Sequence, residues 1–259
     1  MRQLCTALAA TLLVVGCTKI DPDPKAVQVE AEEPRAWAAD GVDKIWIESV
    51  SGNIAVTAAG DADSITADIT RYATGEDSAD ALAWLDSVAV KDESNGGELE
   101  IECQFPSDFQ GHNLGAAFQM SSPAGKSLRL ELTNGDIDID GMAAGAELDC
   151  VNSNVSIVGL QGGALVEAVN GDVDCDLAAL AAPESAVLST VNGNLVLSLP
   201  AGVSATFDAQ TGTGSVAVTG FGDVSYTTNE DRHKAGTIGG GGATIDLDGV
   251  NGNVTIRAR

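Results

Sequence analysis

The strongest constraint on the fold is a short motif, Asn-Gly or a close variant followed by alternating apolar residues, that returns along the chain. Successive asparagines from Asn134 to Asn192 lie 18, 18 and 22 residues apart. A near-constant period of this length is typical of a chain built from stacked, similar coils. The clearest copies are Thr133–Ile139, Val151–Ile157, Val169–Cys175, Val191–Leu197 and Val250–Ile256.

Each copy predicts two strands joined by a turn. The Asn-Gly pair tolerates positive φ and therefore turns the chain. Apolar residues alternate on both sides of the turn, with Leu130 and Leu132 before the first copy and Ile137 and Ile139 after it. Alternation with a period of two indicates strands that are buried on one face only.

Two architectures are compatible with these units. Asn-Gly between alternating strands is also a strong hairpin signal, so an antiparallel meander or a β-sandwich is the alternative. The near-constant period and the constant turn favour an all-β fold, a β-solenoid with Asn-Gly turn repeats of about 18–22 residues, because stacked coils bring identical residues together. The turn asparagines are then predicted to form a ladder of Asn134, Asn152, Asn170, Asn192 and Asn251.

The regions outside the repeats are less regular. The alternation predicts strands at Ile45–Ile47 and Ile65–Ile69, and the pattern at Glu76–Leu85 predicts a short amphipathic helix in the N-terminal third. Asn229–Gly242 ends in four consecutive glycines. We expect it to be a mobile excursion before the last coil.

The N-terminus has the pattern of a signal peptide. A positive charge at Arg2 precedes the apolar run Leu4–Val15, which is too short to span a bilayer. Gly16-Cys17 directly after this run resembles the lipobox of bacterial lipoproteins, which implies removal of residues 1–16 and lipidation of Cys17. Thr18, where an aspartate would imply inner-membrane retention, favours the outer membrane of the cell envelope.

The composition divides the rest of the chain and limits its partners. Residues 17–40 combine prolines with acidic residues, which predicts an extended tether between the lipidated cysteine and one domain at 41–259. The net charge is −25. Such an acidic chain repels nucleic acid, so the expected partners are the membrane, through the lipid anchor, and a protein of the envelope.

The sequence offers few groups for catalysis. No Lys, Arg or His occurs between Leu130 and Asp231, which removes the usual general bases and oxyanion clamps from the repeats. The two histidines, His112 and His233, lie far apart in the sequence. We therefore expect a protein that is not an enzyme and that has no cofactor.

One spacing matches a calcium-binding loop. Asp136, Asp138 and Asp140, followed by Gly141 and Glu147, satisfy the EF-hand pattern. The aspartates alternate with isoleucines of the repeat, so they should form a row along a strand rather than a cage. Weak Ca²⁺ binding stays an alternative, because carboxylates on adjacent coils would lie about 4.8 Å apart. Its candidate ligands are Asp136, Asp138, Asp140, Asp172 and Asp174.

Three cysteines follow Cys17. An oxidising compartment allows one disulfide among Cys103, Cys150 and Cys175 and leaves one thiol. Alternatively, all three are small buried apolar residues. At the C-terminus, the charges of Arg257 and Arg259 are expected to prevent the exposed edge of the stack from pairing with another molecule.

The order of the motifs resembles a known family. Ser51-Gly52-Asn53-Ile54 comes first, Ser122-Pro123-Ala124-Gly125 closes the irregular middle, and Leu197-Ser198-Leu199-Pro200 comes late in the repeats. This layout over 41–259 resembles the bacterial putative-adhesin family, a β-solenoid domain of unknown function. The resemblance implies an extracytoplasmic β-solenoid and no catalytic residues. The expected function is a non-enzymatic envelope lipoprotein for adhesion or protein scaffolding, and the alternative is a divalent-cation- or carbohydrate-binding module.

Overall fold

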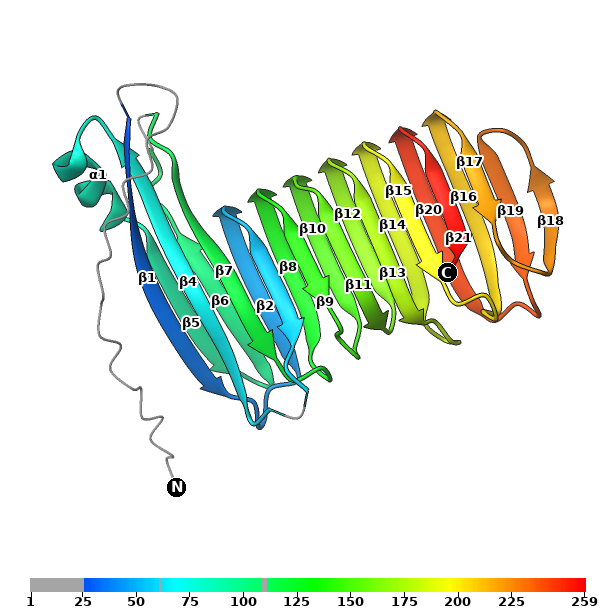
Figure 1. Cartoon of the computed structure of the whole chain (residues 1–259), viewed down its shortest axis with the longest axis horizontal. Helices are drawn as coiled ribbons and strands as arrows, with labels where there is room; N and C mark the ends of the chain where they lie inside the picture. The colour runs from blue at the N-terminus through cyan, green and yellow to red at the C-terminus, as the bar shows by residue number, and fades with distance from the viewer. Residues whose placement is uncertain (1–25, 61, 109–110) are drawn as a thin grey trace.

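The computed structural model describes residues 26–60, 62–108 and 111–259. The expected signal peptide, Cys17 and the first part of the expected tether lie outside these ranges. The described residues form two long sheets that face each other, with one short helix, α1 (Ser78–Leu85), at the N-terminal end (Figure 1). No helix in the described ranges is both long and apolar enough to cross a membrane.

The chain passes back and forth between the two sheets. The ten-stranded sheet, here called sheet A, contains in spatial order β1 (Val27–Ala38), β4 (Ser64–Gly75), β7 (Leu114–Ser122), β3 (Ile54–Ala58), β9 (Ile137–Asp140), β11 (Val155–Gln161), β13 (Val173–Ala179), β15 (Leu195–Leu199), β21 (Val254–Ala258) and β17 (Val216–Thr219). The eleven-stranded sheet B contains β18 (Val224–Asn229), β19 (His233–Ile238), β16 (Ala205–Thr213), β20 (Ala243–Asn251), β14 (Ser185–Asn192), β12 (Ala164–Asn170), β10 (Ala146–Asn152), β8 (Ser127–Asn134), β2 (Lys44–Ser51), β6 (Glu98–Gln104) and β5 (Ala89–Asn95).

Each sequence repeat is one coil of a β-solenoid. Its first strand lies in sheet B, its Asn-Gly turn crosses to the other side, and its second strand lies in sheet A, as in β8–β9 and β10–β11. Equivalent strands of neighbouring coils pair in parallel, and Asn152 of β10 lies opposite Asn134 of β8. The solenoid prediction is therefore confirmed, and the hairpin alternative is wrong, because the strands flanking each turn belong to different sheets.

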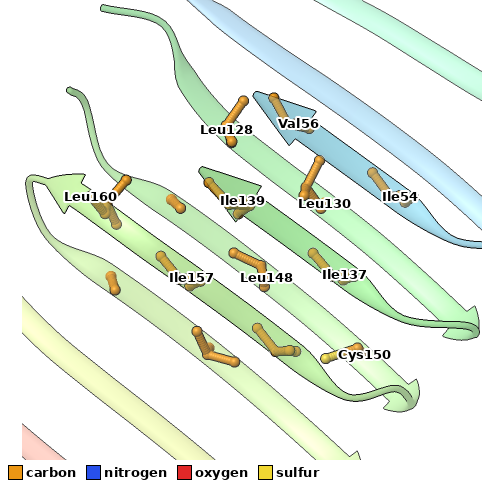
Figure 2. Close-up of a cluster of buried hydrophobic side chains, with 14 of the residues drawn as sticks. Ile54, Val56, Leu128, Leu130, Ile137, Ile139, Leu148, Cys150, Ile157 and Leu160 are labelled. Carbon is orange, nitrogen blue, oxygen red and sulfur yellow. The ribbon is translucent and has the colours of Figure 1, made fainter. Parts of the chain in front are cut away.

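The core is a thin aliphatic layer between the sheets. Inward-facing residues such as Leu130, Ile137 and Leu148 are at most 1% exposed. Figure 2 shows these side chains stacked in columns from coil to coil, so that each contacts its equivalents above and below. Burying each such side chain contributes roughly 1.5–3 kcal/mol, and the alternating pattern repeats that contribution in every coil.

The turn glycines are required by the close approach of the coils. Gly171 has a φ of +134°, and a Cβ at this position would lie 1.9 Å from the carbonyl oxygen of Ser153 in the preceding coil. Gly193 stands above Gly171 with the same 1.9 Å conflict. A side chain is excluded here both by the backbone angle and by the neighbouring carbonyl.

The spatial order of the coils differs from their order in the sequence. The last coil, β20–β21, lies between β14–β15 and β16–β17 and pairs in parallel with both (Figure 1). The expectation that Arg257 and Arg259 blunt an open end is therefore wrong. At this end of the stack the outermost strands are β17 in sheet A and β18 in sheet B.

The expected tether is shorter than its composition indicated. Residues 27–38 form β1, which pairs antiparallel with β4 along its whole length. Pro34 is tolerated because β1 is the edge strand of sheet A and needs hydrogen bonds on one side only. Ion pairs of Glu33 with Arg71 and of Arg35 with Asp92 hold this charged strand in place.

The excursion expected at Asn229–Gly242 is mostly regular structure. Its central part is β19, which pairs antiparallel with β16 on one side and β18 on the other. The hairpin β18–β19 extends sheet B beyond β16, and the glycine run forms the turn into β20. The glycine-rich composition did not reveal this strand, because its partner β16 lies more than 20 residues earlier in the chain.

Candidate functional site

The predicted asparagine ladder is present at the end of the sheet B strands. The side-chain amide of each asparagine donates to the amide oxygen of the preceding member at 2.8–2.9 Å. Each inner member therefore donates to one neighbour and accepts from the other, and Asn134 at the start donates to the carbonyl of Val50 at 3.3 Å. The ladder contains Asn134, Asn152, Asn170, Asn192 and Asn251.

A second ladder runs two residues further on and alternates carboxylates with amides. The Oδ1 atom of Asp136 accepts from the backbone N–H and the side-chain amide of Asn154, at 3.2 and 3.1 Å. Asp172 accepts in the same way from Asn194, at 2.7 and 3.0 Å. Asp136 and Asp172, two of the candidate calcium ligands, thus fix the turns of neighbouring coils.

The other candidate ligands lie on the outer face of sheet A, and the strand register separates them. Ser156 pairs with Asp138 on one side and with Asp174 on the other. The carboxylates are therefore two coils apart, or about 9.6 Å, and not the 4.8 Å of adjacent coils. Glu147, the last residue of the EF-hand pattern, belongs to β10 in the opposite sheet.

The last coil brings cations to these carboxylates. Arg257 lies 3.8 Å from Asp174, and Arg259 lies 3.2 Å from Asp176. Arg257 also donates to the Ser198 hydroxyl at 2.8 Å. These groups surround a shallow hollow of about 390 Å³ on the outer face of sheet A. Because the arginines neutralise the aspartates, the hollow is poorly suited to a divalent cation.

The part of the chain that the structure describes holds no group of three or more His, Cys, Asp or Glu side chains placed to bind a metal ion. His112 contacts the carbonyl of Thr74 at 2.7 Å and stacks on Trp84. His233 lies in β19, 2.9 Å from Asp208. The two histidines are therefore accounted for by local contacts and do not meet.

The three cysteines are free and buried, so the alternative of small apolar core residues is confirmed and the disulfide is not formed. Burial raises the pKa of the Cys103 thiol to about 12 and that of Cys150 to about 11. Burial likewise raises the pKa of Cys175. These thiols stay protonated and unreactive at neutral pH.

The outer face of sheet B carries a row of carboxylates on five consecutive strands. They lie opposite one another in the register, so neighbours are about 4.8 Å apart. Like charges in this position repel each other. We call this set the acidic row; it contains Glu102, Glu48, Glu131, Asp149 and Glu167.

The environment of the acidic row changes the pKa of Glu48. Its partial burial, together with the charges of Glu131 and Glu102, raises the pKa of this carboxyl, while Arg129 acts in the opposite direction. Arg129 is ion-paired with Glu131 at 2.9 Å and lies over the Trp46 ring. Two cations therefore accompany the five carboxylates: Arg129 beside Glu131, and Lys91 of β5, which lies opposite Glu102 at the end of the row.

An apolar row runs beside the acidic row, two residues further along β2, β10 and β12, and continues on β14 and β20, while β8 carries Thr133 at this position. Its members are 37–49% exposed, although each is a large aliphatic side chain. We call this set the valine row; it contains Val50, Val151, Val169, Val191 and Val250.

The two sides of the acidic row differ in shape. On the side away from the valine row, a hollow of about 150 Å³ opens in sheet B. Its walls carry four carboxylates and one cation, with the exposed Leu165 among them. The lining residues are Arg129, Glu131, Glu147, Leu148, Asp149, Leu165 and Glu167.

A comparison with protein-family models matches the region that forms the repeats. The family model described as Toastrack DUF4097 matches residues 44–257, nearly the whole predicted domain. The chain belongs to the Toastrack family. This is a domain of unknown function, and its description names no reaction.

Solved structures similar to the Toastrack chain include three adhesion-related proteins. A putative cell adhesion protein from Clostridium sporogenes is 12% identical, with a TM-score of 0.43, over 89% of this chain and 100% of that chain. A putative adhesin from Bacteroides fragilis is 14% identical, with a TM-score of 0.31, over 88% and 97% of the two chains. One from Parabacteroides distasonis is 10% identical, with a TM-score of 0.21, over the same shares. No curated protein matches the chain.

The sequence analysis of this Toastrack chain missed the acidic row of sheet B. It singled out the aspartates after each turn, whereas the continuous acidic row precedes the turns, on sheet B. The sequence could have revealed this row, because Glu131, Asp149 and Glu167 recur with the same 18-residue period as the turns. Among the exposed large apolar side chains of the described residues, Tyr226 is the only aromatic.

Proposed function

We propose that this Toastrack protein is a non-enzymatic lipoprotein of the bacterial cell envelope that makes protein contacts through its solenoid face, in adhesion or in scaffolding. The lipobox-like Cys17 supports the anchor, and the acidic charge argues against nucleic acid as partner. The observation that carries the proposal is the outer face of sheet B, where exposed side chains repeat in register over many coils.

A repeated surface of this kind suits recognition of a protein better than catalysis. Enzymes hold their reacting groups in a cleft that excludes water, and the two hollows described above are shallow and lie on outer faces. Solenoids commonly bind partners along extended surfaces formed by equivalent positions of successive repeats.

Deletion of the solenoid tests the function. Cells carrying the full chain are compared with cells in which residues 27–259 are removed and the anchor segment is retained. We expect the deletion to abolish attachment to a surface or to partner cells, measured as retained cells under flow. Unchanged attachment would contradict the proposal.

The anchor is tested separately at Cys17. Replacement Cys17→Ser removes the thiol that lipidation requires, so metabolically incorporated palmitate and membrane association should both be lost. Cys103→Ser is the matched control, because this buried thiol should not be lipidated. Retention of the label in the Cys17→Ser variant would rule out the anchor.

Binding of divalent cations is a second candidate, supported by the 4.8 Å spacing of the acidic row. In a melt at matched ionic strength, millimolar CaCl₂ should then raise Tm by several degrees relative to EDTA. The increase should vanish in Asp149→Asn/Glu167→Gln and persist in Asp136→Asn/Asp138→Asn. Equal melts in Ca²⁺ and Na⁺ would leave protein contact as the function.

A further inference from the structure

We infer that the outer face of sheet B is a docking surface for a basic, amphipathic protein segment, one that presents lysine or arginine side chains beside a row of apolar side chains. This inference rests on the proposed function, because it names the class of partner that the solenoid face would hold. The docking surface consists of the valine row, the acidic row and the 150 Å³ hollow next to it.

The valine row is an exposed apolar stripe and not a set of isolated residues. Five of the nine exposed large apolar side chains of the described residues belong to it. The register stacks Val151 on Val169, Val169 on Val191, and Val191 on Val250, so the stripe is continuous over four coils. Apolar surface that is contiguous and exposed is characteristic of an interaction site.

The acidic row specifies the charge of the partner. On β2, β10 and β12 a carboxylate lies about 7 Å from a valine of the valine row, which is the distance between residues i and i+2 of a strand. Within the row, partial burial raises the pKa of Glu48, and the charges of Glu131 and Glu102 raise it further. Cationic side chains from a partner would relieve this repulsion, so binding is favoured by electrostatic complementarity.

The hollow gives a place for one basic side chain. It has a volume of about 150 Å³ and is lined by Glu131, Glu147, Asp149 and Glu167 around the exposed Leu165. A lysine or arginine can lay its methylene stem on Leu165 and direct its charge to the carboxylates. Arg129 occupies one side of the hollow and pairs with Glu131, which leaves the other carboxylates for the partner.

Charge also argues against the other occupants of an apolar stripe. A second copy would place an acidic row against the same acidic row, and the chain as a whole carries a charge of −25. An anionic lipid surface is repelled for the same reason. A basic, amphipathic protein segment complements both rows, because its cations pair with the acidic row and its apolar side chains pack on the valine row.

The test uses the full chain and a short synthetic peptide of leucine and lysine, in which the lysines line one side of an amphipathic helix. Binding is measured by fluorescence anisotropy at two salt concentrations. We expect saturable binding that weakens at high salt, and no binding of a matched peptide with glutamate in place of lysine.

Matched double variants separate this surface from general attraction to an acidic protein. Asp149→Asn/Glu167→Gln on sheet B should weaken binding at least tenfold. Asp138→Asn/Asp140→Asn on sheet A makes the same change in net charge and should weaken it less than twofold. Equal weakening by both pairs, or no binding at all, would overturn the inference.

The valine row is tested with replacements of the same shape. Val151→Thr/Val169→Thr should weaken binding at least fivefold, while Val158→Thr, an exposed position on sheet A, should leave it unchanged. Melting curves check that each variant is folded. If peptide binding fails this pattern while deletion of the solenoid still abolishes cell attachment, the choice of partner is wrong and the proposed function stands.

Discussion

Single residues in the turns determine how closely the coils can stack. The turn glycines have positive φ. A carbonyl of the neighbouring coil lies so close to each of them that a Cβ would overlap with it. The asparagines and aspartates on either side of them hydrogen-bond to their equivalents in the next coil. Asn and Asp alternate at the second position from Asp136 to Asn194, so no two carboxylates of this ladder are adjacent.

Replacement of a turn glycine should be far more damaging than replacement of a loop glycine. Gly171→Ala should lower the free energy of unfolding by on the order of 3 kcal/mol, because the new Cβ combines an unfavourable φ with a contact to Ser153. Gly202→Ala is the control, since nothing lies within 4 Å of its Cβ position and its φ is not positive. Urea denaturation measures both, and similar values for the two variants would contradict the account of the turn.

Removing one charge from the acidic row should stabilise the protein at neutral pH. The folded state raises the pKa of Glu48 above its ordinary value of 4.5, so ionisation of this carboxyl opposes folding. Glu48→Gln should therefore increase the free energy of unfolding by about 0.5 kcal/mol at pH 7. The gain should shrink as pH falls through the raised pKa and vanish below 4.5, where Glu48 is protonated in both states.

The control for this pH dependence is Glu230→Gln, which removes one charge in the turn between β18 and β19, outside the acidic row. Thermal melts of both variants between pH 4 and pH 8 give the comparison. A gain for Glu48→Gln that stays constant across this range would show that charge repulsion in the row is not the cause.

Among the secondary-structure elements, the last coil has the largest consequence for the fold. β20 is the only parallel partner of β16 and separates it from β14, and β21 separates β15 from β17. The C-terminal residues thus complete the interior of the stack. This insertion also carries Arg257 and Arg259 to the aspartates of β13.

A core substitution in β20 should disturb both of its neighbours. Leu247 is fully buried and pairs in register with Leu188 of β14 and Ala209 of β16. Leu247→Ala should lower the free energy of unfolding by about 3 kcal/mol and reduce hydrogen-exchange protection in β14 and β16. Val250→Thr, on the exposed face of the same strand, should change it by less than about 0.5 kcal/mol. Loss of protection confined to β20 would contradict the central position of this coil.

On the scale of the whole molecule, the excess of negative charge opposes compaction. The chain has 38 acidic and 13 basic residues, and the described structure gathers many of the acids in rows. Salt shortens the distance over which these charges repel one another, from about 30 Å at 0.01 M to about 3 Å at 1 M.

Salt should therefore stabilise the folded protein. Raising NaCl from low millimolar concentration to 0.5 M should increase Tm by several degrees, because screening reduces the repulsion between acidic residues. Differential scanning calorimetry measures the shift, and Na₂SO₄ at the same ionic strength separates screening from general salting-out. A Tm that falls with NaCl would mean that ion pairs such as Arg35–Asp92 contribute more than the repulsion does.

The sequence by itself determined the repeating unit. The Asn-Gly pairs, the alternating apolar residues and the near-constant period predicted the all-β solenoid and its asparagine ladder, because both depend on contacts between equivalent residues of neighbouring repeats. The short helix was predicted from its own local pattern. The buried cysteines also followed from their place in the alternation, at inward-facing positions such as Cys150 and Cys175.

Only the tertiary structure decided where the coils and the terminal strands lie. The insertion of β20–β21, the pairing of β1 with β4 and the pairing of β19 with β16 all depend on strands distant in sequence. Local pattern specifies which face of a strand is buried, but the choice of neighbour comes from long-range packing and hydrogen bonding. The acidic and valine rows exist as surfaces for the same reason, since one-dimensional spacing becomes a continuous row only when the coils stack in register.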